Sequence, residues 1–440
     1  MPRAPRASRA TRASRAHRRR PSVYLVAAVA GCLVGLVGGS FRWCLVRAEE
    51  LYTSLLVASE RLGGPALLLP VLVTAAGAAI ACAIARRMPS AAGSGIQEVE
   101  AVWRGERTPP TLWLVPARFA GGVIAMGSGL LLGREGPTVH MGAVIGAEAG
   151  RRTRMSAQDV TLLHTSLAGA GLAVAFTAPL GGILFVFEEV TKTVRPRLVL
   201  LAVIGTAAAV ACSGLIVGSR AVLPVPAVAG PPMALLPAFL LFGAATGVLG
   251  AGYNRLVVGM LSSCDRVRRV GPVARAALIG AVVGLLLCAD PLLGGGGEQL
   301  NERVLGGGIP AVAVLAGYCV VRFVAGPLSY AAGAPGGLFA PLLALGAVWG
   351  ALVHGLALPL LPDGGSSAVP FVIAGMAAMF SAAVRAPVTG IVLTVEITGS
   401  TTLLVPLLLA CFAATLTADR MGSTPVYDSL RLRMSGTGTP

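Results

Sequence analysis

The stretch GREGPTVHMGAVIG at residues 133–146 recurs further along the chain as GLFAPLLALGAVWG at residues 337–350. Both copies carry the pattern Gly-x3-Pro-x4-Gly-Ala-x2-Gly. A second pattern, Ala-Pro-x2-Gly-Ile-x4-Glu, occurs at residues 178–188 and again at residues 386–396. Two patterns that recur in the same order and at almost the same spacing indicate an internal structural repeat. In membrane proteins, such repeats place the substrate site at their interface, near the bilayer midplane.

The composition is that of a polytopic membrane protein. Apolar residues make up 55% of the 440 residues, charged residues only 12%, and the mean hydropathy is +0.79. A soluble domain carries about 25% charged residues. The composition therefore excludes a soluble enzyme, a disordered chain and a secreted disulfide scaffold.

Segments without charged residues differ widely in length. A helix needs about 20 residues to cross the hydrocarbon core; the window 198–219 meets that length, and the window 136–147 does not. Glycine (58 residues) and proline (30 residues) are both enriched, and irregular backbone at membrane depth is tolerated where it lines a cavity. We therefore predict an all-α polytopic membrane protein with broken and re-entrant helices.

Each copy of the first pattern starts a helix in a way that suits an anion. Pro137 and Pro341 fit the first turn of a helix, and Gly133, Gly136 and Gly337 leave the backbone free to bend. The N-terminus of a helix binds anions through its exposed N–H groups. Two such termini would hold an anion through partial charges only, which still allows its release.

The two copies differ at one position that matters chemically. Glu135 stands where the second copy has Phe339. A carboxylate at an anion-binding helix terminus competes with the anion when ionised and leaves the site when protonated. An acid inside a membrane is a functional candidate, so we predict that Glu135 is a proton-operated gate. The alternative is an acid that simply pairs with the adjacent Arg134.

Two further features remain open on the sequence alone. Ser94, between Gly93 and Gly95, offers a hydroxyl and backbone amides to an anion, but an ordinary helix cap has the same appearance. Glu188 and Glu189 close a long apolar run. They are either a solvated pair or the place where protons reach the membrane interior.

Together, the segments 93–96, 133–137 and 337–341 resemble the signature motifs of the CLC family of chloride channels and proton/chloride antiporters. They stand in the order and spacing of that family over about residues 20–430. The resemblance implies a fold of two inverted repeats and a homodimer with one ion pathway per subunit. It also implies chloride and protons as the transported ions, with no cofactor, no metal and no enzymatic reaction.

The resemblance further implies roles for individual residues. The chloride ligands would be Ser94, the amides of Leu338 and Phe339, and the hydroxyl of Tyr427. Glu135 would be the external gating glutamate and Glu189 the internal proton-transfer glutamate, with Glu188 beside it at the dimer interface. The supporting residues would be Gly93, Gly95, Gly133, Arg134, Gly136, Pro137, Gly337 and Pro341, with Arg118 near the pathway. The resemblance also bears on the type of transport. Because channels of the family usually lack an acid at the position of Glu189, an antiporter is favoured. A passive voltage- or pH-gated chloride channel on the same fold is the alternative.

The chain departs from the family pattern in two places. Gln97 stands where the first motif normally ends in proline, and the stretch after Tyr427 is short, with no room for the CBS domains of many relatives. We expect one ion-transport domain over 21–435. Its repeat halves would cover about 21–219 and 233–420, with the last helix from about 425.

Positions 1–20 hold eight arginines and no acid, which is half of the net charge of +16. Such a tail before an apolar span predicts a cytoplasmic N-terminus, and because it lacks aromatic residues we do not expect nucleic-acid binding. We expect a multi-pass protein of a bacterial inner membrane, with both termini cytoplasmic.

An intramembrane serine protease that uses Ser94 or Ser128 is a further alternative, but no convincing Ser/His pair supports it.

Overall fold

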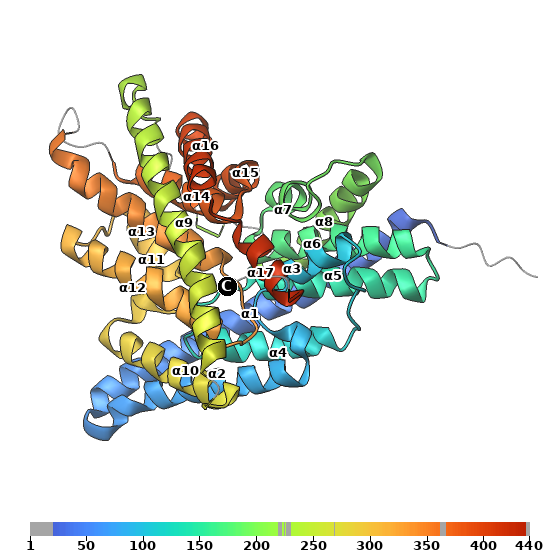
Figure 1. The fold of residues 1–440 in the computed structure, drawn as a ribbon, viewed down its shortest axis with the longest axis horizontal. Coiled ribbons are helices and arrows are strands. Elements are labelled where there is room, and N and C mark those ends of the chain that lie inside the picture. The colour runs from blue at the N-terminus through green and yellow to red at the C-terminus, as the bar shows by residue number, and fades with distance from the viewer. Residues whose placement is uncertain are drawn as a thin grey trace, which may run out of the picture.

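The structure is a computed structural model that describes residues 21–218, 222–223, 225, 230–267, 269–360 and 367–436. The arginine-rich tail, 1–20, and the last four residues lie outside the described residues. The described part of the chain contains 17 α-helices and isolated bridges but no β-strand (Figure 1). The first eight helices are α1 (Val23–Leu62), α2 (Leu69–Arg87), α3 (Ile96–Trp103), α4 (Leu114–Gly127), α5 (Glu135–Arg152), α6 (Ala157–Phe176), α7 (Pro179–Phe185) and α8 (Pro196–Val217). The others are α9 (Leu236–Arg266), α10 (Pro272–Ala289), α11 (Glu298–Leu305), α12 (Val312–Ala331), α13 (Phe339–Ala357), α14 (Val369–Val384), α15 (Pro387–Thr398), α16 (Leu404–Arg420) and α17 (Val426–Met434).

The helices differ widely in length. Among the described residues, eight helical segments are long and apolar enough to cross a membrane. In contrast, α3 and α11 have eight residues each, which is less than half of the length needed to cross. The predicted fold class, an all-α membrane protein with broken helices, is confirmed.

The internal repeat of the sequence is also a repeat of the fold. Helices α5 and α13 both begin inside the first pattern, and α7 and α15 both begin inside the second, so that α1–α8 match α9–α16 in order. Gly133 and Gly337, which are repeat equivalents, form an antiparallel bridge with N–O distances of 2.8 and 2.7 Å. Because equivalent segments run in opposite directions where they meet, the repeats are inverted.

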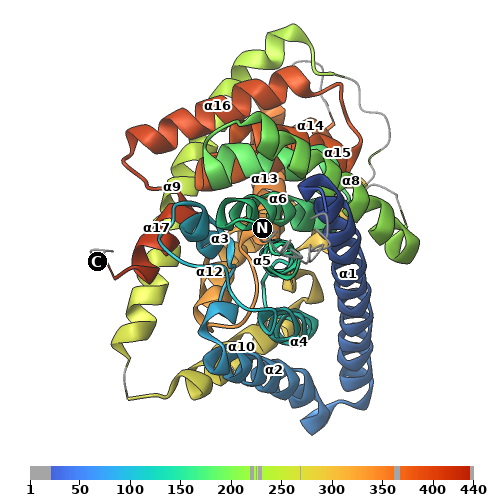
Figure 2. The same ribbon diagram turned by 90° about the vertical axis from the view of Figure 1, so that its right-hand side faces the viewer.

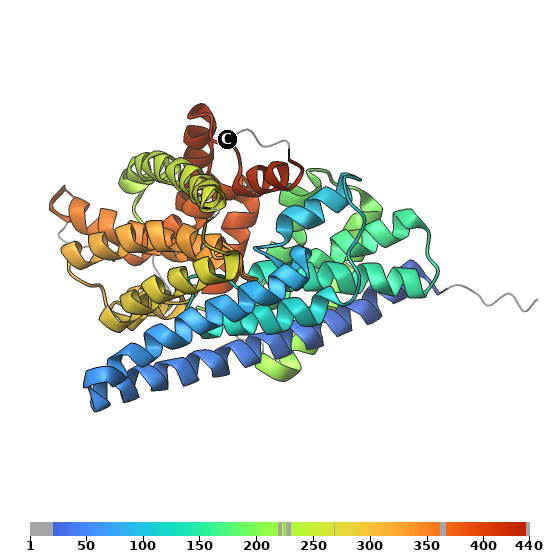
Figure 3. The same ribbon diagram turned by 60° about the horizontal axis from the view of Figure 1, so that its bottom comes forward.

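The two halves are not separate bodies. Helix α10 of the second half packs along α2 of the first, and α15 packs against α7 (Figures 1 and 3). Glycines allow equivalent close crossings within each half. A Cβ atom added to Gly142 or Gly171 would collide with the α5–α6 crossing, and one added to Gly346 or Gly375 would collide with the α13–α14 crossing. Small residues at such crossings let helix backbones approach closely in a membrane.

Helices α7 and α15 cap each other through repeat-related acids. The carboxylate of Glu188 accepts hydrogen bonds from the backbone N–H groups of residues 388–389, at 2.6–3.0 Å, where α15 begins. The carboxylate of Glu396 accepts from residues 180–181, at 2.7–3.0 Å, where α7 begins. The first N–H groups of a helix have no partner within the helix, so each acid satisfies donors of the opposite half.

Candidate functional site

Three loops that are far apart in the sequence meet in the interior. The N–H of Gly93 donates to the carbonyl of Ala334, and the N–H of Gly336 donates to the carbonyl of Gly93, both at 3.1 Å. Gly337 is in turn bridged to Gly133. The three motifs therefore form one hydrogen-bonded centre from which α3, α5 and α13 start, and α17 packs beside α3 (Figure 2).

Ser94 is fully buried at this centre. Its backbone N–H donates to the hydroxyl of Tyr330 at 3.1 Å, but its own hydroxyl has no hydrogen bond of normal geometry among the described residues. A Cβ atom added to Gly136 would lie only 2.6 Å from that hydroxyl oxygen, so the first turn of α5 packs directly on Ser94. Since buried polar groups are nearly always hydrogen-bonded, the hydroxyl is available for a ligand.

Glu135 is the first residue of α5 and is also fully buried. One carboxylate oxygen accepts a long hydrogen bond of 3.4 Å from the backbone N–H of Ala340, in the first turn of α13. The other oxygen has no partner among the described residues. The carboxylate therefore points at the N-terminus of the repeat-related helix, where an anion is favoured.

Arg134 turns away from its neighbour. Its Nε donates to the carbonyl of Ala175 at 3.0 Å, and its Nη2 lies 3.3 Å from a carboxylate oxygen of Glu298. The alternative in which Glu135 pairs with Arg134 is therefore wrong. The sequence motifs did not predict this ion pair because Arg134 and Glu298 lie far apart in the chain.

The other predicted chloride ligands lie around the same point. Tyr427, the second residue of α17, is fully buried, and its hydroxyl has no hydrogen bond of normal geometry among the described residues. That hydroxyl lies within electrostatic range of Glu135 and close to Ser94. Leu338 and Phe339 are fully buried where α13 begins. The structure brings all of the predicted ligands together, and their binding of chloride stays a prediction.

Arg118 holds the Ser94 loop in place. It is fully buried, and its guanidinium donates to the carbonyls of Ser90, Ala92, Gly93 and Ser94 at 2.5–3.4 Å. The sequence predicted only that this residue lies near the pathway. The geometry makes it the clamp that fixes the loop.

The second repeat has an equivalent clamp that the sequence analysis missed. Arg322, the repeat counterpart of Arg118, donates to the carbonyls of Leu292 and Gly294 at 3.2 and 3.0 Å. Counted back from the starts of the equivalent helices α3 and α11, these two residues correspond to Ser90 and Ala92, whose carbonyls Arg118 binds. The glycine run 294–297 before α11 is thus the counterpart of the Ser94 loop, and its similarity to the glycines around Ser94 was the signal for it.

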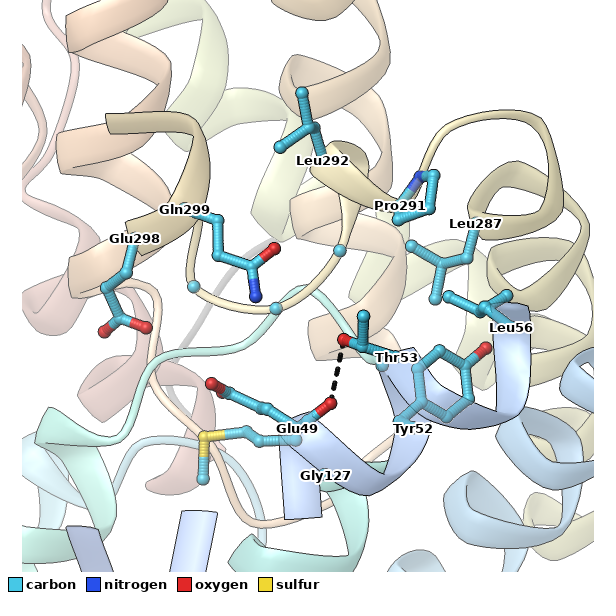
Figure 4. Close-up of a pocket in the computed structure, with 16 residues that line it drawn as sticks. Glu49, Tyr52, Thr53, Leu56, Gly127, Leu287, Pro291, Leu292, Glu298 and Gln299 are labelled. Atoms are coloured by element: carbon cyan, nitrogen blue, oxygen red, sulfur yellow. Dashed lines mark hydrogen bonds between the residues drawn. The ribbon is translucent and has the colours of Figure 1, made fainter. Parts of the chain in front are cut away.

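A pocket lies beside this second loop (Figure 4). Residues 294–298 line it together with Glu49, Tyr52 and Thr53 of α1. Glu298 also lines a smaller pocket that includes Ala340. It therefore lies between the larger pocket and the turn of α13 that binds Glu135.

Glu188 and Glu189 have different surroundings although they are adjacent. Glu188 caps α15, as described above. Glu189, in the π-helical turn η3 (Val186–Thr191) that continues α7, is buried, and one of its carboxylate oxygens has no partner among the described residues. Its charged neighbours include Lys192, Glu100 and Asp428. The two acids are therefore not a solvated pair.

Comparison with known proteins identifies the family. The family model described as "Voltage gated chloride channel" matches residues 76–419. This chain belongs to the CLC family.

CLC proteins resemble the chain over almost its whole length. H(+)/Cl(-) exchange transporter ClcA of Vibrio parahaemolyticus serotype O3:K6 (strain RIMD 2210633) is 38% identical over 419 residues, which cover 93% of this chain and 89% of that protein. The protein of the same name from Cronobacter sakazakii (strain ATCC BAA-894) is 34% identical over 424 residues, covering 94% of this chain and 90% of that protein.

Solved CLC structures have the same fold. A slow cyanobacterial Cl-/H+ antiporter superimposes with a TM-score of 0.90 at 28% identity, covering 94% of this chain and 98% of that one. A eukaryotic CLC transporter superimposes with a TM-score of 0.80 at 21% identity, covering 94% of this chain and 74% of that one, and this likeness concerns the fold alone.

Proposed function

We propose that this CLC protein is a secondary active transporter that exchanges chloride for protons. The observation that carries the proposal is the pair of buried acids, Glu135 and Glu189, with the hydroxyl of Tyr427 in electrostatic range of both. The names of the relatives, an H(+)/Cl(-) exchange transporter and a Cl-/H+ antiporter, support the same activity.

Chloride would bind among neutral donors. The hydroxyls of Ser94 and Tyr427 have no hydrogen bond of normal geometry among the described residues, and the first amides of α13 face the same centre. Hydroxyls and amides hold an anion by partial charge, so that it can leave again. No lysine or arginine side chain is needed as a ligand, which agrees with Arg118 and Arg134 being used by carbonyls and by Glu298.

Glu135 would couple the two ions. When ionised, its carboxylate competes with chloride for the N-terminus of α13, where it already accepts a hydrogen bond from Ala340. When protonated, it loses its attraction to that terminus and leaves the site to chloride. Protonation of Glu135 and binding of chloride at the N-terminus of α13 would then be linked steps of the same exchange.

Glu189 would supply the proton from the other side. A proton does not cross an apolar interior unaided, and an intramembrane carboxylate can carry it. Tyr427 has both acids as charged neighbours, which supports a chloride site between them. A passive chloride channel would have no use for a buried acid at this position.

The assembly and location are part of the proposal. We propose a homodimer in a bacterial inner membrane, with one pathway per subunit, a transport domain over 21–435 and both termini cytoplasmic. The eight candidate spans, the arginine-rich tail and the bacterial relatives support it. A transporter of this kind moves ions and changes no covalent bond.

The variant Glu189→Gln tests the role of the second acid. It keeps the shape of the side chain and removes the proton carrier. In liposomes, this variant should still move chloride but should no longer drive protons. Glu302→Gln, at an exposed acid on α11, is the control and should behave as wild type. Full proton coupling in Glu189→Gln would remove Glu189 from the pathway.

A further inference from the structure

Six charged side chains form a cluster next to Glu189, which we call the Lys192 cluster. Its members are Glu100, Arg104, Glu106, Lys192, Asp428 and Arg431. None of them belongs to the sequence motifs described above. They come from α3 and the turn after it, from the residue after η3, and from α17.

Lys192 is the member that connects the end of η3 to α17. Its ammonium nitrogen lies 2.7 Å from a carboxylate oxygen of Asp428 and 3.6 Å from one of Glu100. The residue ends η3 in a left-handed conformation, with φ 51°, and this sharp turn in the chain accompanies the contact with α17. Among the described residues, no other cation links η3 to α17.

The contact is between charged groups. Burial alone would lower the pKa of Lys192, but the hydrogen bond to Asp428 and the charges of Glu189 and Glu100 raise it above its usual value. Burial alone would raise the pKa of Asp428, but the hydrogen bond and charge of Lys192, together with hydrogen bonds to Glu100 and Arg431, hold it below its usual value. Both partners are therefore ionised at neutral pH.

Members of the Lys192 cluster are close in sequence to the predicted transport residues. Lys192 follows Glu189 by one helical turn, Asp428 directly follows Tyr427, and Glu100 lies on the short helix that starts beside Ser94. The Glu100 side chain is buried, with Arg104 at 2.8 Å and Arg431 at 3.5 Å. The cluster thus ties together the three segments that carry the proton acid and both hydroxyls of the chloride site.

We propose that Lys192 is a positioning residue for coupling: its ion pair with Asp428 holds α17 against η3, so that Tyr427 and Glu189 move together. This inference rests on the proposed exchange of chloride for protons. If the pair is broken, α17 is released from the proton-carrying segment, and Tyr427 can leave the chloride site without a matching proton transfer at Glu189. Chloride then passes without its proton.

A second ion pair on the same helix provides the matched control. Arg433 of α17 pairs with Asp265 of α9 and donates to Ser262 at 2.9 Å. This pair also anchors α17, but it does not contact η3. If Lys192 acted only by anchoring the helix, loss of the Arg433 pair would have the same effect.

The experiment measures the ratio of chloride to protons moved by liposomes that contain the full chain. Lys192→Met keeps most of the length of the side chain and removes its charge, and it should raise the ratio about two- to fivefold, as expected for loss of one partly exposed ion pair. Asp428→Asn should reproduce the increase, and Lys192→Arg should restore the wild-type ratio. Arg433→Met should leave the ratio unchanged.

Two results would overturn the inference: an unchanged ratio in Lys192→Met, or an equal increase in Arg433→Met. If Lys192→Met does not fold, Asp428→Asn decides by the same criterion. The wild-type protein separates this inference from the proposed function. Absence of proton movement in the wild type contradicts the exchange itself, whereas a coupled wild type with an insensitive Lys192 contradicts only the positioning role.

Discussion

Among single residues, Glu135 provides the most direct test of the proposed exchange of chloride for protons. Glu135→Gln removes the titratable group but leaves a side chain of the same shape at the N-terminus of α13. A neutral amide is a poorer competitor for an anion site than a carboxylate, so chloride should still move, and its movement should lose most of its dependence on pH. Proton movement driven by a chloride gradient should stop. The measurement is flux of both ions at several pH values.

The gate assignment would be wrong if Glu135→Gln kept full proton coupling. Glu298→Gln offers a nearby comparison because that acid pairs with Arg134 and is not placed at the anion site. It should retain coupling. An equal loss of coupling in both variants would indicate that the charge around Arg134, and not the gate, is what matters.

For single residues, the sequence predicted which residues form the site better than it predicted which side chains pair with each other. The motifs predicted Ser94, Glu135 and Tyr427, and all three lie at one centre. They did not predict that Arg134 binds Glu298, because a pairing between opposite halves of the chain leaves no trace in the local spacing. Tyr330, which accepts from Ser94, was missed for the same reason: it is one aromatic residue within an apolar helix.

Among the helices, the mutual capping of α7 and α15 makes a separate prediction. Glu396→Gln removes the charge from a carboxylate that accepts two backbone hydrogen bonds. Loss of hydrogen bonds to a charged group costs about 1.5–3 kcal/mol each at most, so the variant should unfold at a lower temperature. Glu188→Gln should lose stability in the same way, since it caps the equivalent helix, and both should remain coupled.

Thermal unfolding in detergent, compared with Glu302→Gln, measures this effect. If Glu396→Gln and Glu188→Gln both unfold with the wild type, the caps contribute little. If Glu188→Gln abolished proton movement as completely as Glu189→Gln, the division of labour between the two adjacent acids would be wrong.

Element types followed from the sequence, but their connections did not. Short apolar windows and glycine runs correctly predicted broken helices, because helix length and backbone freedom are local properties. The caps and the clamp at Arg322 depend on residues in distant parts of the chain. These contacts follow from the way the two repeats pack against each other in the structure.

For the whole molecule, the proposed dimer can be tested with the same repeat-related helices. Leu180 at the start of α7 and Val388 at the start of α15 are exposed large apolar residues, as is Leu241 of α9. Bilayers supply little hydrophobic drive between helices, so an interface needs close contact of matching surfaces. In a background without the eight native cysteines, Leu180→Cys should cross-link to a dimer in liposomes, and Leu241→Cys should not.

Equal cross-linking at both positions, or full activity of a monomer at every protein-to-lipid ratio, would count against a dimer built on α7 and α15. The sequence predicted these helices as an interface only through the family resemblance. Leu180 and Val388 at the starts of these helices are exposed in the single chain, which agrees with that prediction.

The central claim is that one molecule exchanges chloride for protons, and one measurement addresses it directly. Liposomes containing the wild-type protein are loaded with chloride, diluted into a low-chloride solution, and followed for chloride and pH at the same time. The account predicts that chloride efflux drives protons inward against their own gradient, and that reversing the chloride gradient reverses the proton movement. Chloride efflux without proton movement under any gradient would contradict it and would identify a passive chloride channel instead.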